Sequence, residues 1–259
     1  MNWRYSGPIY LIFELHTADA SLLHQAFSQI LEAIDSYSCL KHLPFHWRFP
    51  ARALEGTQTG SDSANSLLSD AFSRGTHMPI LSGYSGIAHY QLLRNDLHRE
   101  LSWAFNNPWQ KGIRDLFQDC EPMLFPRYPD WLRGSSRQIY QQFPAALFLP
   151  QYLGITAGSV CFLLQNGKRI RQLTETRVKL TNQKLMIKGL KAGCRRPGTL
   201  LILDALSVIS QNVASELASD LVMLLGGKRP AQFSSLVQLI ESDRTNGSGP
   251  DAVDDFESG

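Results

Sequence analysis

The sequence predicts an α/β fold in which parallel strands form a (β/α)7-like barrel. Short apolar runs of strand length alternate with longer segments whose apolar residues recur at helical spacing, as in strands linked by crossover helices. About seven such runs occur in a chain of 259 residues, which suits one large domain. An open doubly wound sheet is the main rival, but the chain contains neither a Gly-x-Gly-x-x-Gly nor a P-loop motif.

The strand-like runs are rich in aliphatic and aromatic residues and are bounded by polar residues. Ile9–His16 is a continuous apolar run that ends in polar residues, which is typical of a strand buried on both faces. We expect the Ile9 and Leu201 runs to belong to one sheet. The runs expected to pair in parallel lie at Ile9, Phe45, Met78, Met123, Ala145, Val160 and Leu201.

Amphipathic segments separate most of these runs. Residues 22–34 carry apolar side chains at helical spacing and follow Asp19 and Ser21, either of which could cap a helix. Similar segments begin near Asn95, Ser135 and Val213. These segments supply the helices that a parallel sheet needs between its strands.

Charge is distributed unevenly along the chain. The 25 Lys and Arg residues exceed the 23 Asp and Glu residues by two. Residues 166–197 hold ten bases and a single acid, Glu175, and resemble an inserted basic β-hairpin that turns at residues 181–183. Residues 241–259 hold six acids and one base without apolar periodicity. We therefore expect a single α/β domain over residues 1–240, followed by a disordered acidic tail.

The composition excludes several classes of protein. Apolar residues make up 43% and charged residues 19%, which is globular composition. No uncharged apolar run reaches the roughly 18–20 residues that span a membrane, and the N-terminus does not resemble a signal peptide. The four cysteines are far apart with no Cys-x-x-Cys pair, which favours reduced thiols. We expect a cytoplasmic protein with no membrane partner. The sequence predicts no particular oligomeric state.

Polar residues that follow the apolar runs are the candidate site residues, because the active site of a barrel lies at the carboxyl ends of its strands. Glu14 and Asp204 end the first and last runs, and Asp130 follows the fourth, so these acids are the candidate catalytic residues. An acid at the end of a buried strand also often caps the next helix, and both roles stay open for Asp204. The candidate substrate-binding residues are His16, Arg48, Tyr84, His89, Trp131 and Arg133.

No cofactor and no metal site are predicted. His42 and His46 are four residues apart, but Pro44 between them prevents a helix, so this spacing does not bring the two rings together. Tyr84 and Trp131 could instead stack on sugar rings, although most large aromatic residues fill cores.

The order of the segments carries a resemblance to known enzymes over residues 8–150. The first strand ends in His16, the third run follows Arg74-Gly75, and the run inside Pro122–Pro126 precedes Asp130. This order resembles the barrel of family-57 glycoside hydrolases and the related polysaccharide deacetylases. The resemblance implies glycoside hydrolysis or transfer on an oligo- or polysaccharide. Asp130 or Glu14 would be nucleophile or base and Asp204 the general acid.

The chain also departs from the pattern of that group. One histidine, His16, stands where the group has a pair, and the glutamate expected directly after Pro126 is absent. The aspartate pair that the deacetylases carry in the first strand and their His-x-x-x-His motif in the second have no convincing counterpart in this chain. A substrate-binding or inactive member of the group therefore stays open.

Two other functions compete with carbohydrate chemistry. The ten bases of residues 166–197 could neutralise phosphates in a non-catalytic module that binds nucleic acid or another polyanion. An assembly or regulatory protein built on a decayed barrel is the third alternative. Salt-sensitive binding to DNA or RNA would favour the binding module, and turnover of glucans or acetylated sugars would favour the hydrolase.

Overall fold

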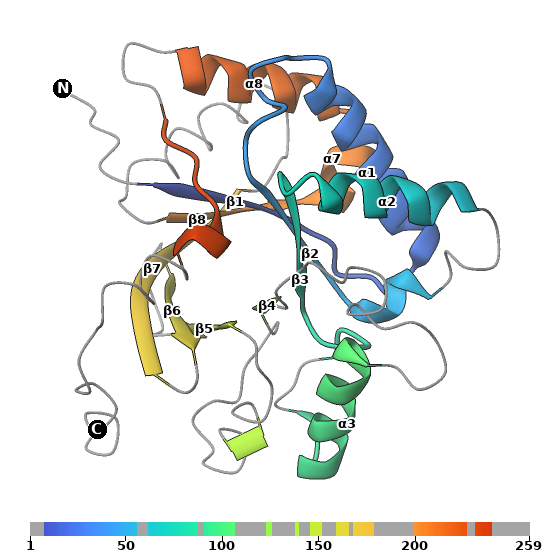
Figure 1. Ribbon diagram of the computed structural model, residues 1–259, viewed down its shortest axis with the longest axis vertical. Helices are drawn as coiled ribbons and strands as arrows, with labels where there is room; N and C mark the ends of the chain where they lie inside the picture. Colours follow the sequence, from blue (N-terminus) through green and yellow to red (C-terminus); the bar gives the residue numbers. More distant parts are fainter. Residues whose placement is uncertain are drawn as a thin grey trace.

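The computed structural model describes residues 8–55, 62–87, 91–106, 123–125, 138–139, 146–151, 159–165, 168–178, 199–226 and 231–239 (Figure 1). The strands are β1 (Ile9–Glu14), β2 (Phe45–Phe49), β3 (His77–Leu81), β4 (Met123–Leu124), β5 (Ala146–Gln151), β6 (Ser159–Gln165), β7 (Lys168–Val178) and β8 (Thr199–Asp204). The described helices include α1 (Ala20–Asp35), the 3-10 helix η1 (Ala51–Leu54), α2 (Asp62–Ser73), α3 (Arg94–Phe105), α7 (Ala205–Ser210) and α8 (Ala214–Gly226).

The strands pair in sequence order, and the order closes on itself because β8 pairs with β1. Strands β1 to β5 are parallel neighbours. β1 and β8 are parallel from the pair Ile9 and Thr199 to the pair Glu14 and Asp204. The predicted α/β fold with a barrel-like sheet is therefore confirmed, and the Ile9 and Leu201 runs are neighbours, as expected.

The expectation that all the runs pair in parallel is wrong for the Val160 run. β6 is antiparallel to both β5 and β7. Only residues 166–167 separate β6 from β7, and only residues 152–158 separate β5 from β6. Parallel neighbours need a crossover of a dozen or more residues, so these short connections permit only antiparallel pairing.

The basic stretch also differs from the expected insertion. Residues 168–178 form β7, which pairs with β6 on one edge and is parallel to β8 on the other. This part of the stretch is a strand of the barrel wall. The predicted turn at 181–183 and the second arm of the hairpin lie outside the described residues.

The two faces of the sheet bury different residues. Ile9, Leu11 and Phe13 pack in a large core that includes residues of α1, α2, α3, α7 and α8. Tyr10 and Ile12 pack with alternate residues of β3, β4 and β8 in a second cluster that contains none of those helices. Since successive side chains of a strand point to opposite faces, the second cluster fills the barrel interior. β1 is buried along its whole length for this reason.

The helices cover the outer face of the sheet. α1 contacts α2, α7 and α8, and Figure 1 shows these four helices on one side of the strands, with α3 past the end of β3. Asp19 caps α1 by accepting hydrogen bonds from the backbone N–H groups of Ser21, at 2.8 Å, and Leu22, at 3.3 Å. No helix of the described residues is long and apolar enough to cross a membrane.

Residues 231–239 close the amino-terminal end of the barrel. The backbone N–H of Ile9 donates to the Gln232 carbonyl, and the N–H of Ser234 donates to the Ile9 carbonyl. Leu236 and Leu239 then join the interior cluster. Residues 231–239 thus pack against the amino-terminal end of the interior cluster, and Glu14, Arg48 and Asp204 lie at or near the carboxyl ends of their strands. The predicted tail, residues 241–259, lies outside the described part of the chain.

Candidate functional site

Three polar residues form a row across neighbouring strands at the carboxyl ends. Asp204 of β8 is in register with Glu14 of β1, and Glu14 is in register with Arg48 of β2. Glu14 follows Tyr10 and Ile12 at intervals of two, so all three occupy the interior face of β1. The row continues into apolar residues, because Arg48 is in register with Ile80, and Ile80 with Met123.

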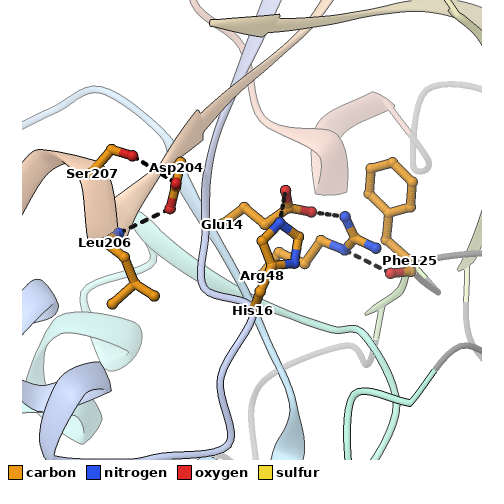
Figure 2. A network of polar contacts seen from close by, with 7 residues as sticks. All are labelled: Glu14, His16, Arg48, Phe125, Asp204, Leu206 and Ser207. Atoms are coloured by element: carbon orange, nitrogen blue, oxygen red, sulfur yellow. Dashed lines mark hydrogen bonds and ion pairs between the residues drawn. The ribbon is translucent and has the colours of Figure 1, made fainter. Parts of the chain in front are cut away.

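The centre of the row is a buried ion pair between Arg48 and Glu14. Nη1 of Arg48 donates to Oε1 of Glu14, and both residues are only 1% exposed (Figure 2). Nε of Arg48 donates to the carbonyl oxygen of Phe125 at 2.7 Å, and the guanidinium carbon lies 4.2 Å from the centroid of the Phe125 ring. A buried carboxylate needs a cation as its partner, because removing its charge from water costs about several kcal/mol.

His16 connects the buried pair to solvent. Its Nε2 lies 2.7 Å from Oε2 of Glu14, and 33% of the His16 side chain is exposed. The backbone N–H of Leu15 donates to the Arg48 carbonyl at 2.8 Å, which ties the chain after β1 to β2. Glu14 therefore gives one oxygen to a fixed cation and the other to an imidazole at the surface.

This arrangement suits proton transfer by the imidazole. A carboxylate that accepts a hydrogen bond from one ring nitrogen fixes the orientation and tautomer of the ring, so that the other nitrogen can exchange a proton with a substrate. Arg48 in turn fixes Glu14. The geometry thus gives His16 the exposed position and Glu14 the orienting position.

Asp204 caps α7. Its Oδ1 accepts from the Leu206 backbone N–H at 3.1 Å, and its Oδ2 accepts from the Ser207 hydroxyl at 2.7 Å. Figure 2 shows these bonds directed to α7, whereas those of Glu14 run to His16 and Arg48. Of the two roles left open by the sequence, these contacts are those of the capping role; the role as general acid stays a prediction.

Tyr84 braces the loop that follows β3. Its hydroxyl donates to Oε1 of Glu55 at 2.7 Å, and its ring meets Trp103 edge-on at 5.4 Å. Gly86 in this loop has φ +76°, and a Cβ there would lie 2.8 Å from Cγ of Pro50, so only glycine fits. The structure thus shows Tyr84 in contact with Glu55 and Trp103, and its contact with a sugar stays a prediction.

The same loop is anchored to α3 by Glu100. Its Oε1 accepts from the Ser85 backbone N–H at 2.6 Å and from the Ser85 hydroxyl at 2.9 Å. Burial raises the pKa of the Glu100 carboxyl, and the hydrogen bonds from residues 84–86 partly oppose that change. Glu100 thus holds the loop after β3 against α3 without being in the row itself.

Four of the predicted site residues lie outside the described part of the chain, namely His89, Asp130, Trp131 and Arg133. Of the others, Glu14, His16 and Arg48 are brought into direct contact. No group of three or more His, Cys, Asp or Glu residues that could hold a metal ion occurs among the residues described. The two nitrogens of His46 contact the Leu11 carbonyl and the Leu236 N–H.

Phe125 contacts the row of polar residues, and the sequence did not single it out. It touches Arg48 through both its carbonyl oxygen and its ring. Its place directly after the apolar pair Met123-Leu124 made it look like ordinary core. One signal could have identified it. Phe125 directly follows the fourth strand, and the ends of parallel strands were expected to lie near Arg48.

No protein-family profile and no curated protein sequence matches the chain. Solved structures do match it. The peptidoglycan deacetylase PdaC of Bacillus subtilis superposes with a TM-score of 0.57 at 11% identity, over 95% of this chain and 94% of that one. The family 4 carbohydrate esterase of Streptomyces lividans gives 0.50 at 10% identity, over 84% and 88% of the two chains.

The 4-α-glucanotransferase of Thermococcus litoralis gives a TM-score of 0.56 at 10% identity over 90% of this chain. The chain spans 40% of the length of that enzyme. At such low identity the likeness concerns the fold alone. The chain therefore has a barrel-like fold similar to those of this glucanotransferase, the peptidoglycan deacetylase and the carbohydrate esterase, which confirms, for the fold, the resemblance that the sequence indicated.

Proposed function

We propose that the protein is a carbohydrate-active hydrolase whose site lies at the carboxyl ends of β1, β2 and β8. The reaction class is glycosidic hydrolysis or transfer, or removal of an acyl group, on an oligo- or polysaccharide. The three structural neighbours support this class, since each is named for an activity on carbohydrate or peptidoglycan.

The observation that carries the proposal is the contact between His16 and Glu14 above a buried arginine. His16 is the group proposed to exchange a proton with the substrate. Glu14 orients its ring, and Arg48 holds Glu14. A buried carboxylate in an ordinary core has no need of an exposed imidazole as its second partner.

Asp130 remains the carboxylate that we propose for the site in addition to Glu14. It follows β4, whose end is in contact with Arg48 through Phe125. In glycosidases the two carboxyl groups are about 5–5.5 Å apart for retention and about 6.5–9.5 Å apart for inversion of configuration. Trp131, Arg133, His89 and Tyr84 are the proposed substrate contacts.

The test is turnover on a panel of α-glucans, peptidoglycan and acetylated chitooligosaccharides. New reducing ends report glycosidic cleavage, and released acetate reports deacetylation. We expect one of these products from the wild type, and a loss of about 100-fold or more in Glu14→Gln and in His16→Gln. His42→Gln is the matched control, because His42 is an exposed histidine that precedes β2 at the opposite end of the barrel.

Equal rates in His16→Gln and His42→Gln would contradict the proposed role of His16. No turnover of any panel member, together with salt-sensitive retention on DNA or RNA, would favour the polyanion-binding alternative instead.

A further inference from the structure

Phe125 joins the interior of the barrel to the proposed site. Its backbone N–H donates to the Leu81 carbonyl at 2.8 Å, which fixes it just past the ends of β3 and β4. Its ring is fully buried and belongs to the interior cluster with residues of β1, β3 and β8. The ring therefore lies between the apolar filling of the barrel and the charged row above it.

Phe125 holds Arg48 in two ways that act on different parts of the guanidinium. The carbonyl oxygen accepts from Nε at 2.7 Å, and the ring lies under the guanidinium carbon at 4.2 Å. The hydrogen bond fixes the direction of the Nε edge, and the ring face fixes the plane. Because the guanidinium is rigid and planar, these two contacts also set where Nη1 meets Glu14.

We infer that Phe125 is a positioning residue for His16, acting through Arg48 and Glu14. The inference rests on the proposed function and assigns it a residue that carries no polar side chain. The attraction between a cation and an aromatic face is strongest where water is excluded, as it is around Arg48, which is 1% exposed. An aliphatic side chain of similar size would fill the same space but would leave the guanidinium without that attraction.

A purely space-filling role makes a different forecast, and Phe45 provides the matched control. Phe45 is also fully buried, but it begins β2 at the other end of the strand and packs in the outer core against Phe13 and His77. Phe45→Leu and Phe125→Leu therefore make the same chemical change at equal burial, one far from Arg48 and one in contact with it.

The experiment compares Phe125→Leu and Phe45→Leu with the wild-type chain by NMR and by kinetics. In Phe125→Leu we expect the Arg48 Nε–H and His16 ring resonances to move and the Arg48 Nε–H to exchange faster with solvent. On a substrate of the panel, kcat should fall by about tenfold, as expected from losing one cation–π contact, with KM changed by less than about twofold. In Phe45→Leu these resonances and kcat should stay at wild-type values.

Wild-type Arg48 and His16 resonances in Phe125→Leu would overturn the inference, as would equal effects of the two variants. If Phe125→Leu does not fold, Phe125→Met also removes the ring, with a more flexible side chain that fills irregular space, and is read in the same way. The NMR arm needs no turnover. A chain that turns over none of the panel would thus overturn the proposed function, while the resonances still decide the role of Phe125.

Discussion

The two ends of the barrel each contain a histidine in contact with the interior, and the two rings have opposite surroundings. His46, in the amino-terminal half, is completely buried between the carbonyl of Leu11, 2.9 Å from Nδ1, and the backbone N–H of Leu236, 3.1 Å from Nε2. His16, at the carboxyl end, meets the carboxylate of Glu14 and is one-third exposed. The first ring has two neutral partners, and the second has a charged one.

The different surroundings indicate different roles for the two histidines, a structural role for His46 and proton transfer for His16. With a carbonyl at Nδ1 and an N–H at Nε2, His46 must carry its proton on Nδ1 and stay neutral, so burial lowers its pKa to about 4. Such a ring connects β1, β2 and residues 231–239 and holds the end of the barrel closed. His16 has a carboxylate partner and contact with solvent, which are the conditions for moving a proton to a substrate.

The largest effect is expected from Arg48→Met, which breaks the buried pair at the mouth. Leaving Glu14 buried without its cation should lower the free energy of unfolding by about 3–5 kcal/mol. Chemical denaturation at pH 7 measures the loss. Adding Glu14→Gln to the same variant should restore part of the stability, and a double variant no more stable than the single one would contradict the charge-based explanation.

The second expected effect is a dependence of stability on pH from the buried histidines. Burial is the main cause that lowers the pKa of both His46 and His77 from 6.5 to about 4, and Arg74 contributes at His77. Between these pH values the unfolded chain binds protons that the folded chain does not. The stability that the neutral rings contribute is therefore complete above pH 6.5. As the pH falls toward 4, the free energy of unfolding decreases by about 1 kcal/mol per pH unit for each ring.

Urea denaturation at pH 7.5 and pH 5.5 tests this dependence, with His46→Gln as the variant that removes one of the two titrating rings. Its stability should change less between the two pH values than that of the wild type. Carboxyl groups contribute equally to both proteins, so they do not affect the comparison. An unchanged difference in His46→Gln would show that His46 is not kept neutral by the fold.

A smaller effect is expected at Asp204, the acid of the row that bonds to α7. Asp204→Ala should cost about 1 kcal/mol as the loss of a helix cap, and Asp204→Asn should cost less, because asparagine also caps helices. If Asp204 acts as a helix cap alone, both variants keep their turnover per folded molecule. Loss of turnover in Asp204→Asn at unchanged stability would instead support the role of general acid.

The smallest effect is expected from deleting residues 245–259. Gly, Ser, Asn and Asp dominate this segment and apolar residues do not recur, so the sequence predicts few contacts. The melting temperature should change by no more than about one or two degrees. A larger fall in a thermal scan would show that the segment docks on the barrel.

Part of the sheet could be predicted because β1, β2 and β3 are buried along their whole length. The runs of β1 and β8 are apolar up to the acid that ends each of them. This pattern alone predicted both strands, and their pairing in one sheet agrees with it. The direction of β6 was missed because pairing direction depends on the lengths of its two connections, which the apolar pattern does not encode. β7 was missed in part because its polar sequence is held by pairing on both edges.

The site was predictable to a similar extent. Glu14 and His16 were found because polar residues at the end of an apolar run mark the mouth of a barrel, and parallel register then brings Arg48 beside Glu14. The contacts of Asp204 could not be predicted in the same way. They exist because α7 begins at the next residue and donates a hydrogen bond to each of the two carboxylate oxygens. Phe125 was missed because an apolar residue reveals no partner until Arg48 is placed beside it.

We propose that His16 takes part in the reaction and that His46 stabilises the fold alone. The most direct test measures kcat per folded molecule for His16→Gln and His46→Gln on the best substrate of the carbohydrate panel. For His16→Gln we expect a fall in kcat of about 100-fold with stability close to wild type. For His46→Gln we expect reduced stability with kcat within about twofold of wild type. Equal losses of kcat in the two variants, or a larger loss in His46→Gln, would contradict it.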